Sequence, residues 1–165
     1  MKTPRLDAQC VVDSPLGPIT LAATARGLAL AWFDAQAHRT ETVDAPVQPT
    51  QQHLALAAQE LARYWTQPRL AFTVPLDPQG SEFQQAVWRA LCGIAPGALS
   101  SYGTIAHQVG RPAAARAVGA AIGRNPIGII VPCHRVVGAN GSLTGYAGGL
   151  HRKEALLTLE GALLT

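Results

Sequence analysis

Residues 101–126 read SYGTIAHQVGRPAAARAVGAAIGRNP and contain two helix-forming stretches separated by a Gly-Arg-Pro turn. Ser100 or Ser101 can cap a helix from Tyr102 to Val109. A second helix is predicted from Ala113 to about Arg124, where Asn-Pro ends it. Two short helices joined by a tight turn have the form of a helix-turn-helix. Many αα-hairpins that bind nothing have the same form, so the pattern alone leaves both interpretations open.

The second of these helices consists almost entirely of small side chains around a single long one, Arg116. Small side chains let a helix backbone approach another surface closely. That surface can be a neighbouring helix or a DNA groove, in which Arg116 would be the one long side chain that probes it.

A third helix is predicted before this pair. Ser81 and Gln84 fit a capping box at its start. Phe83, Val87, Leu91 and Ile94 then recur at helical spacing until Pro-Gly at residues 96–97 ends the helix. The second half of the chain is therefore expected to be mainly helical.

The first half has the short apolar runs and turn residues of β structure. Strands are predicted in AQCVVDS (8–14), PITLAAT (18–24) and GLALAWF (27–33), forming an antiparallel meander. Further predictions are a loop at 36–50, an amphipathic helix at 51–66 and a strand at 70–76, with a boundary at 77–80. The fold class is thus α/β with two lobes: a small sheet with a helix over residues 1–80, and a helical domain over residues 81–165.

Charge is distributed unevenly over the 165 residues, whose net charge is +3. Residues 1–82 hold six Lys/Arg against eight Asp/Glu, whereas residues 83–165 hold seven against two. A polyanion would bind the second half, although uneven surface charge without a partner is the alternative. No stretch of 18 apolar residues and no signal peptide is present, so we expect a cytoplasmic protein.

The most informative segment for chemistry is residues 125–137, NPIGIIVPCHRVV. The apolar run 127–131 predicts a buried strand or extended segment that leads through Pro132 to Cys133 and His134. A free cysteine is only about 3% thiolate at neutral pH, and a neighbouring imidazole or cation raises that fraction. Adjacent side chains of a strand point to opposite faces, so this pair can cooperate only if the chain bends or a water relays the proton. On this adjacency alone, a buried structural cysteine beside a surface histidine is the better interpretation.

A series of motifs favours a reactive Cys133 over a structural one. In order they are Phe83-x-x-x-Val87-Trp88, Ser101-Tyr102-Gly103-x-Ile105-Ala106, Arg116-Ala117-Val118-Gly119, Asn125-Pro126, Pro132-Cys133-His134-Arg135-Val136, Gly145-Tyr146-Ala147-Gly148-Gly149, and Lys153-Glu154-Ala155-Leu156-Leu157 followed by Glu160. With them the sequence resembles the O6-alkylguanine-DNA alkyltransferases, also called methylated-DNA–protein-cysteine methyltransferases. The resemblance covers about Phe83 to Glu160, and the first 80 residues match the family only loosely.

The resemblance implies DNA repair by irreversible transfer of an alkyl group from the O6 oxygen of guanine to Cys133. In such a family His134 acts as the base through a water, and Glu160 orients His134. Asn125 forms the turn before the cysteine segment. Tyr102 protonates or hydrogen-bonds N3 of the base as negative charge develops on guanine.

The resemblance also implies how DNA is bound. The damaged nucleotide is flipped out of the duplex from the minor groove, and Arg116 fills the gap in the stack. The implied DNA-binding residues are Ser101, Tyr102, Arg116, Ala117, Gly119 and Ala120. The implied substrate pocket has the carbonyls of Cys133 and Val136 at the guanine amine, with Tyr146, Ala147 and Thr144 around the alkyl group. O4-alkylthymine is a second possible substrate. We expect a monomer, with clustering on DNA left open.

Some features depart from the family pattern. Certain relatives have serine where Ala147 stands, so here only a backbone N–H can reach O6, and Thr144 can narrow the pocket. Other relatives bind zinc in the N-terminal lobe, but Cys10 is the only cysteine before Cys92 and we expect no metal and no cofactor. The competing interpretations are a lesion-binding module without transfer, in which the cysteine is replaced, and an ordinary helix-turn-helix regulator.

Overall fold

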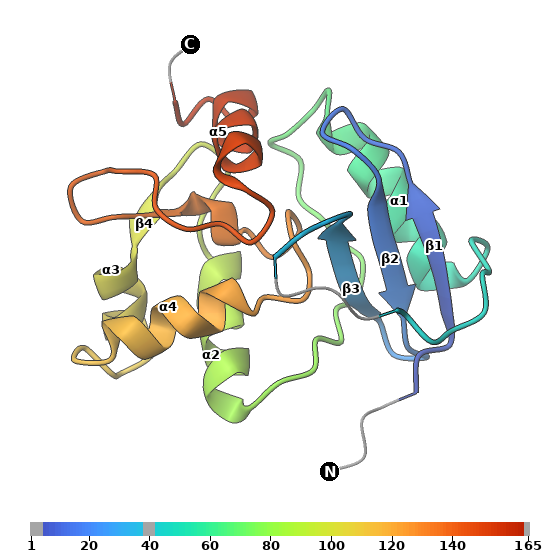
Figure 1. Cartoon of the computed structure of the whole chain (residues 1–165), viewed down its shortest axis with the longest axis horizontal. Coiled ribbons are helices and arrows are strands. Elements are labelled where there is room, and N and C mark those ends of the chain that lie inside the picture. The colour runs from blue at the N-terminus through green and yellow to red at the C-terminus, as the bar shows by residue number, and fades with distance from the viewer. Residues whose placement is uncertain (1–4, 38–41, 164–165) are drawn as a thin grey trace. The chain divides into compact units, whose positions relative to one another are not determined.

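The computed structural model describes residues 5–37 and 42–163, which pack as two units. One unit contains the described residues up to Gln79 together with Pro126–Gly128, and the other contains Gly80–Asn125 and the chain from Ile129 onward. Each unit combines strands with at least one helix (Figure 1), so the predicted α/β class is confirmed. The predicted domain boundary at residue 80 stays a prediction. Within the described chain, no helix is both long and apolar enough to cross a membrane.

The first unit is built on a three-stranded antiparallel sheet with the order β1-β2-β3, as the meander prediction expected. Its strands are β1 (Ala8–Val12), β2 (Ile19–Ala23) and β3 (Leu28–Phe33), and helix α1 (Gln52–Tyr64) packs against them (Figure 1). Apolar side chains of the sheet and of α1 are withdrawn from water to form the core of this unit.

The prediction of a strand at residues 70–76 is wrong. The backbone donors of this segment bind a side chain instead of a neighbouring strand, because the buried carboxylate of Glu60 accepts from the N–H groups of Thr73 and Val74. Pro75 has no N–H to continue a ladder. Only an isolated bridge between Leu28 and Leu76 remains.

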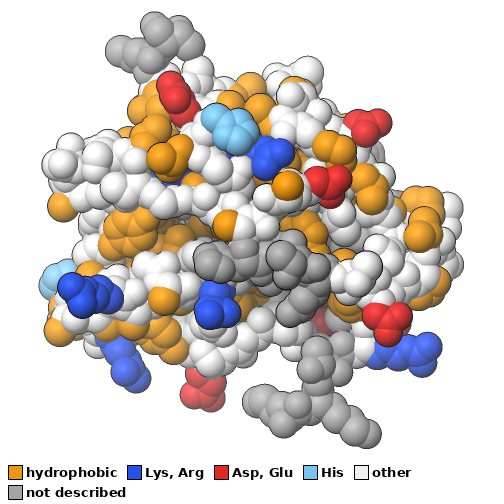
Figure 2. All heavy atoms as spheres, viewed as in Figure 1, with side chains coloured by type: hydrophobic (Ala, Val, Ile, Leu, Met, Phe, Trp, Pro, Cys, Tyr) orange, Lys and Arg blue, Asp and Glu red, His pale blue; other side chains and the backbone are white. Residues whose placement is uncertain are grey.

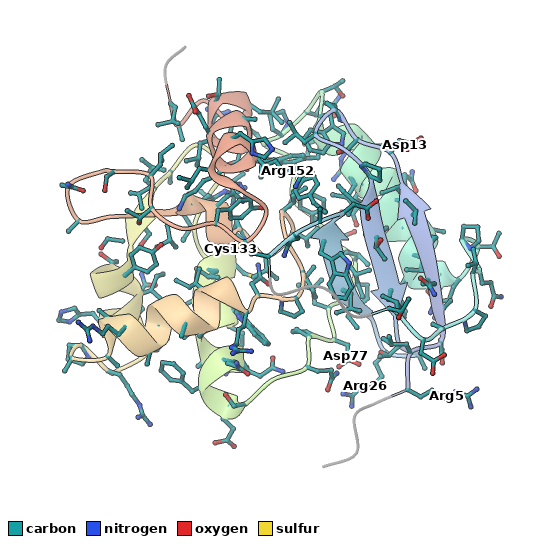
Figure 3. The ribbon with its side chains drawn as sticks, viewed as in Figure 1. Arg5, Asp13, Arg26, Asp77, Cys133 and Arg152 are labelled. Atoms are coloured by element: carbon teal, nitrogen blue, oxygen red, sulfur yellow. The ribbon has the colours of Figure 1, made fainter. Side chains whose placement is uncertain are left out.

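A polar contact holds the end of this segment beside β3. Asp77 accepts from the Thr24 hydroxyl at 2.6 Å and from the Arg26 guanidinium at 3.0 Å, and Figure 3 shows Arg26 and Asp77 close together. Burial alone would raise the pKa of Asp77, but the hydrogen bonds from Arg26 and Thr24 outweigh it and the pKa is lowered. Gly27 is required here because a Cβ atom would lie 2.6 Å from the Pro75 carbonyl oxygen.

The second unit contains three mutually packed helices, α2 (Glu82–Cys92), α3 (Tyr102–Gln108) and α4 (Ala115–Gly123). The predicted capping box at Ser81 and Gln84 is confirmed. Helix α3 ends one residue earlier than predicted, and α4 begins two residues later because Ala113 and Ala114 belong to the preceding turn.

Helix α4 has a buried face and an exposed face, and small side chains lie on both. Val118, Ala121 and Ile122 are buried, whereas Arg116, Ala117 and Ala120 are exposed. The Trp88 indole of α2 donates to the Ala121 carbonyl at 2.9 Å across the helix contact. Close helix packing therefore accounts for one face of α4 and leaves the other face open to a ligand.

The segment before the cysteine is a buried turn, so the extended run predicted at 127–131 is wrong. Ile129 has φ = 68°, a conformation that a β-branched residue rarely adopts and that costs about 1–3 kcal/mol. The sequence left open whether the chain bends at the cysteine, and the structure has a bend there, the 3-10 helix η1 (Cys133–Arg135). Strand β5 (Val136–Val137) follows and pairs in parallel with β4 (Ser100–Ser101), and helix α5 (Leu150–Leu159) ends the unit.

Candidate active site

Cys133 lies at the start of η1, which packs against α2 and α5 (Figure 3). The residue is 8% exposed, so it is largely desolvated yet still touches solvent. Burial raises the pKa of the Cys133 thiol. A hydrogen bond from Asn125, the charge of Lys153 and the N–H groups of Cys133 and His134 oppose that rise by favouring the thiolate.

Asn125 is the residue that ties α4 to the cysteine segment. Its side chain is buried and donates to the Val131 carbonyl at 2.9 Å, in addition to its contact with the thiol. The predicted role of Asn125 in the turn before Cys133 fits this position.

His134 is fully buried and its Nε2 lies 2.8 Å from Oε1 of Glu160. A carboxylate only accepts, so Nε2 carries the proton and Nδ1 presents its lone pair. Nδ1 is buried without a hydrogen-bond partner among the described residues. Burial lowers the pKa of His134 more than the hydrogen bond and charge of Glu160 raise it. The imidazole is thus held neutral, in the tautomer that can accept a proton.

Arg135 completes this buried group, and the sequence interpretation missed its role. Its guanidinium donates to both oxygens of Glu160, at 2.9 and 2.8 Å, and to the Ile94 carbonyl at 2.5 Å. In the sequence Arg135 is only part of the motif around Cys133, whereas in the structure it binds Glu160. An arginine inside an otherwise apolar run was the available signal, since a buried charge needs a partner.

Tyr102 reaches the same region from the start of α3. The β4–β5 pairing sets Ser100 opposite Val136, which brings the beginning of α3 next to the cysteine segment. The Tyr102 hydroxyl donates to the Thr144 carbonyl at 3.2 Å. A Cβ atom at Gly119 of α4 would be in ordinary contact with the Tyr102 ring, so α4 supports the ring.

Of the predicted pocket residues, Val136 precedes the loop 138–149, and Thr144, Tyr146 and Ala147 lie within it. Val136 is buried, Tyr146 and Ala147 are partly buried, and Thr144 is exposed. Desolvation raises the pKa of Tyr146 well above its usual value, and a charge on Cys133 raises it further. The structure thus brings Cys133, His134, Glu160, Asn125, Tyr102 and the pocket residues into one unit.

The predicted DNA-binding residues have different environments. Arg116, Ala117 and Ala120 are exposed on α4, whereas the Ser101 side chain caps α3 by accepting from the Thr104 N–H at 3.1 Å. Exposed cations extend this face, and Figure 2 shows blue side chains over the region where Figure 1 places α3 and α4. The exposed Lys or Arg residues between Tyr102 and Asn125 are Arg111, Arg116 and Arg124.

In residues 5–37 and 42–163, no group of three or more His, Cys, Asp or Glu side chains is arranged so that it could hold a metal ion. The reactive groups that the described residues bring to the site are the Cys133 thiol, the His134 imidazole, the Glu160 carboxylate and the Tyr102 phenol.

Comparison with known proteins connects this site to a family. Residues 82–162 match the family described as 6-O-methylguanine DNA methyltransferase, DNA binding domain. Residues 10–78 match the 6-O-methylguanine DNA methyltransferase, ribonuclease-like domain. The chain belongs to the 6-O-methylguanine DNA methyltransferase family. The motif resemblance is confirmed, and the loose match expected before residue 80 is corrected, since the family match also spans most of the first unit.

Individual members of the family are similar over nearly the whole chain. The methylated-DNA–protein-cysteine methyltransferase of Methanosarcina acetivorans is 47% identical, covering 92% of this chain and 97% of that protein. The crystal structure of Mycobacterium tuberculosis OGT in complex with DNA is 47% identical with a TM-score of 0.85, covering 93% and 92% of the two chains. An O6-methylguanine DNA methyltransferase of Methanococcus jannaschii has a TM-score of 0.65 at 27% identity, covering 94% and 95%.

Proposed function

We propose that this protein moves an alkyl group, typically methyl, from O6 of guanine in DNA to the sulfur of its own Cys133, once per molecule. Family membership sets the class of reaction, which is DNA repair by alkyl transfer. The observation that carries the assignment to Cys133 is the neighbouring imidazole of His134, with Nε2 on Glu160 and Nδ1 buried without a partner.

The proposed proton path uses that open nitrogen. A water between the Cys133 thiol and Nδ1 of His134 carries the thiol proton to the imidazole. The resulting imidazolium is stabilised by Glu160, to which its Nε2–H already donates. Glu160 is in turn held by Arg135, so it acts as a fixed orienter.

The transfer itself forms one bond and breaks one. The thiolate attacks the alkyl carbon, a sulfur–carbon bond forms, and the bond from carbon to O6 breaks with its electron pair left on guanine. Tyr102 donates a hydrogen bond or a proton to N3, which stabilises that developing charge. The carbonyls of Cys133 and Val136 bind the guanine amine, while Tyr146, Ala147 and Thr144 surround the alkyl group.

The product is a thioether, which offers no easy leaving group. The proposed reaction therefore consumes the protein, with one transfer per chain. Thiol, base and proton donor suffice, so the proposal includes no cofactor. We place the reaction in the cytoplasm, a reducing compartment in which the Cys133 thiol persists.

DNA is the partner, and the Mycobacterium tuberculosis relative has been crystallised with it. We propose that α4 enters the minor groove through its exposed small residues, Ala117 and Ala120. The damaged base must leave the stack to meet a largely buried thiol, which costs a few kcal/mol. Arg116 fills the vacated space. The proposal also includes O4-alkylthymine as a second substrate and the clustering of monomers on DNA.

Intact-protein mass spectrometry after incubation with O6-methylguanine DNA tests the assignment. We expect one methyl group per chain, and peptide mapping should place it on Cys133. Cys92 is exposed and Cys10 lies in β1, so both serve as internal controls in the same digest. A methyl group on either of them, or more than one per chain, would contradict the proposal.

Arg116→Ala is expected to slow repair of O6-methylguanine in duplex DNA more than it slows reaction with free O6-benzylguanine. The free base needs no extrusion from a stack, so only the duplex reaction uses the arginine. Rate constants for both substrates give the comparison, with the exposed Arg89→Ala as a matched loss of charge on α2. Equal losses for the two substrates would remove the role of Arg116 in base extrusion.

A further inference from the structure

Lys153 is a wholly buried cation to which the reaction described above gives no task. It lies in the first turn of α5 and is 0% exposed. No ion pair found among the described residues involves Lys153. A cation in the first helical turn faces the positive end of the helix dipole, and a buried charge is costly without strong partners. Its position therefore requires an explanation beyond packing.

Its ammonium has three hydrogens and three carbonyl partners. Nζ lies 2.6 Å from the Val136 oxygen, 2.8 Å from that of Thr144 and 3.2 Å from that of Gly145. Val136 directly follows the 3-10 helix of Cys133, whereas Thr144 and Gly145 belong to the loop that leads to Tyr146. The ammonium thus joins two segments that are both assigned to the base pocket.

One of these carbonyls also binds Tyr102. The Thr144 oxygen accepts from the Tyr102 hydroxyl at 3.2 Å as well as from Lys153. A carbonyl oxygen has two lone pairs and can serve both donors. Lys153 therefore fixes the acceptor that holds the proposed proton donor in place.

Lys153 also acts on the thiol through its charge. The ammonium binds the Val136 carbonyl, and the Val136 N–H donates to the Cys133 carbonyl, so the charge lies close to the thiol. Burial raises the pKa of Cys133 and lowers the pKa of Lys153, and the attraction between thiolate and ammonium opposes both shifts. His134 and Tyr146 are the other titratable groups coupled to this pair. His134 is held neutral and Tyr146 is neutral at physiological pH, so Lys153 is the positive charge that can compensate a thiolate.

We propose that Lys153 is a positioning residue for alkyl transfer: its ammonium holds the Val136, Thr144 and Gly145 carbonyls together as a wall of the base pocket, and it supplies the positive charge opposite the Cys133 thiolate. This inference rests on the proposed function.

Lys153→Gln and Lys153→Met separate the charge from the hydrogen bonds. Glutamine can still donate two hydrogen bonds, whereas methionine fills the space without donating. Lys153→Arg retains the charge, and Arg89→Met is the control for loss of an exposed cation. The first measurement is the rate of Cys133 alkylation by iodoacetamide from pH 6 to pH 11, with peptide mapping to count only that thiol.

Both neutral variants should raise the pKa of Cys133, so that alkylation at pH 7 falls about tenfold for each pKa unit and recovers at high pH. Lys153→Arg and Arg89→Met should leave that pKa near the wild-type value. A purely structural role predicts the opposite sign, because loosened packing admits water and brings the pKa down toward that of a free thiol. An unchanged or lowered pKa in Lys153→Gln overturns the proposal.

The second measurement is the dependence of the transfer rate on O6-benzylguanine concentration at pH 10. Lys153→Met should require a higher concentration for half-maximal rate than Lys153→Gln, since only methionine abolishes the hydrogen bonds of the pocket wall. Equal values for the two variants contradict the positioning role. If the wild-type protein forms no adduct on Cys133, the proposed function fails; if it does and the variants behave like it, only the role of Lys153 fails.

Discussion

Cys133→Ala is expected to form no methyl adduct with O6-methylguanine DNA, while its affinity for the duplex stays near that of the wild-type protein. The substitution removes the thiol of the residue that directly precedes His134 and leaves α3, α4 and their exposed cations unchanged. Transfer of radiolabelled methyl and a binding titration at one fixed salt concentration measure the two properties separately.

Cys92→Ala is the matched control for this experiment. Its thiol is exposed on α2, so its loss should change neither transfer nor binding. If Cys133→Ala still accepted methyl groups at the wild-type rate, the assigned nucleophile would be wrong. If it lost transfer and DNA binding together, the result would indicate a damaged fold rather than a missing nucleophile, and circular dichroism would detect that damage.

Glu160→Leu is expected to lower the free energy of unfolding by about 3–5 kcal/mol, because it leaves a buried Arg135 without its carboxylate. For a chain of this size, that loss corresponds to a fall of about 6–20 °C in Tm. His134 also loses the acceptor that fixes its tautomer. The transfer rate should therefore fall by about 10²- to 10⁴-fold, the usual contribution of a general base.

Thermal unfolding measures the loss of stability, and single-turnover kinetics measure the loss of transfer rate. The double variant Arg135→Leu/Glu160→Leu shows whether the second loss is a consequence of the first. Removing both charges should recover much of the stability, since an apolar pair of similar volume is often as stable as a buried ion pair. Transfer should stay slow in the double variant, because His134 still has no orienter. Recovery of transfer together with stability would show that Glu160 acts through folding alone.

Local signals predicted the regular elements well. Ser81 and Gln84 defined the start of α2, and Gly-Arg-Pro and Asn-Pro marked the ends of α3 and α4 to within about a residue, because capping and chain breaking depend on a few neighbouring residues. Helix α2 ends at Cys92, before the predicted stop at residues 96–97. The same signals failed at 70–76 and 127–131. Both segments are apolar enough for strands, but the Glu60 carboxylate takes the backbone donors of the first and Ile129 turns the second. These causes are tertiary contacts and a backbone reversal that no hydrophobic pattern records.

For the site as well, some features could be predicted from the sequence and others depend on tertiary contacts. Motif order identified Cys133, His134, Glu160 and Tyr102 as candidates, and the family comparison confirms the relationship on which they were chosen. The partners of those residues could not be predicted, since nothing in the sequence pairs Arg135 with Glu160, which lies 25 residues further along the chain.

By itself the sequence determined the family, the α/β class and which side chains are chemically able to act. The tertiary structure decided how they are paired: which nitrogen of His134 faces the carboxylate, where the Arg135 charge is neutralised, and that Lys153 is buried on three carbonyls. The physical reason is that helix caps and turns depend on residues close in the chain. Desolvation and hydrogen bonding of buried charges depend instead on groups that only folding brings together, such as Arg135 with Glu160 and Tyr102 with Thr144.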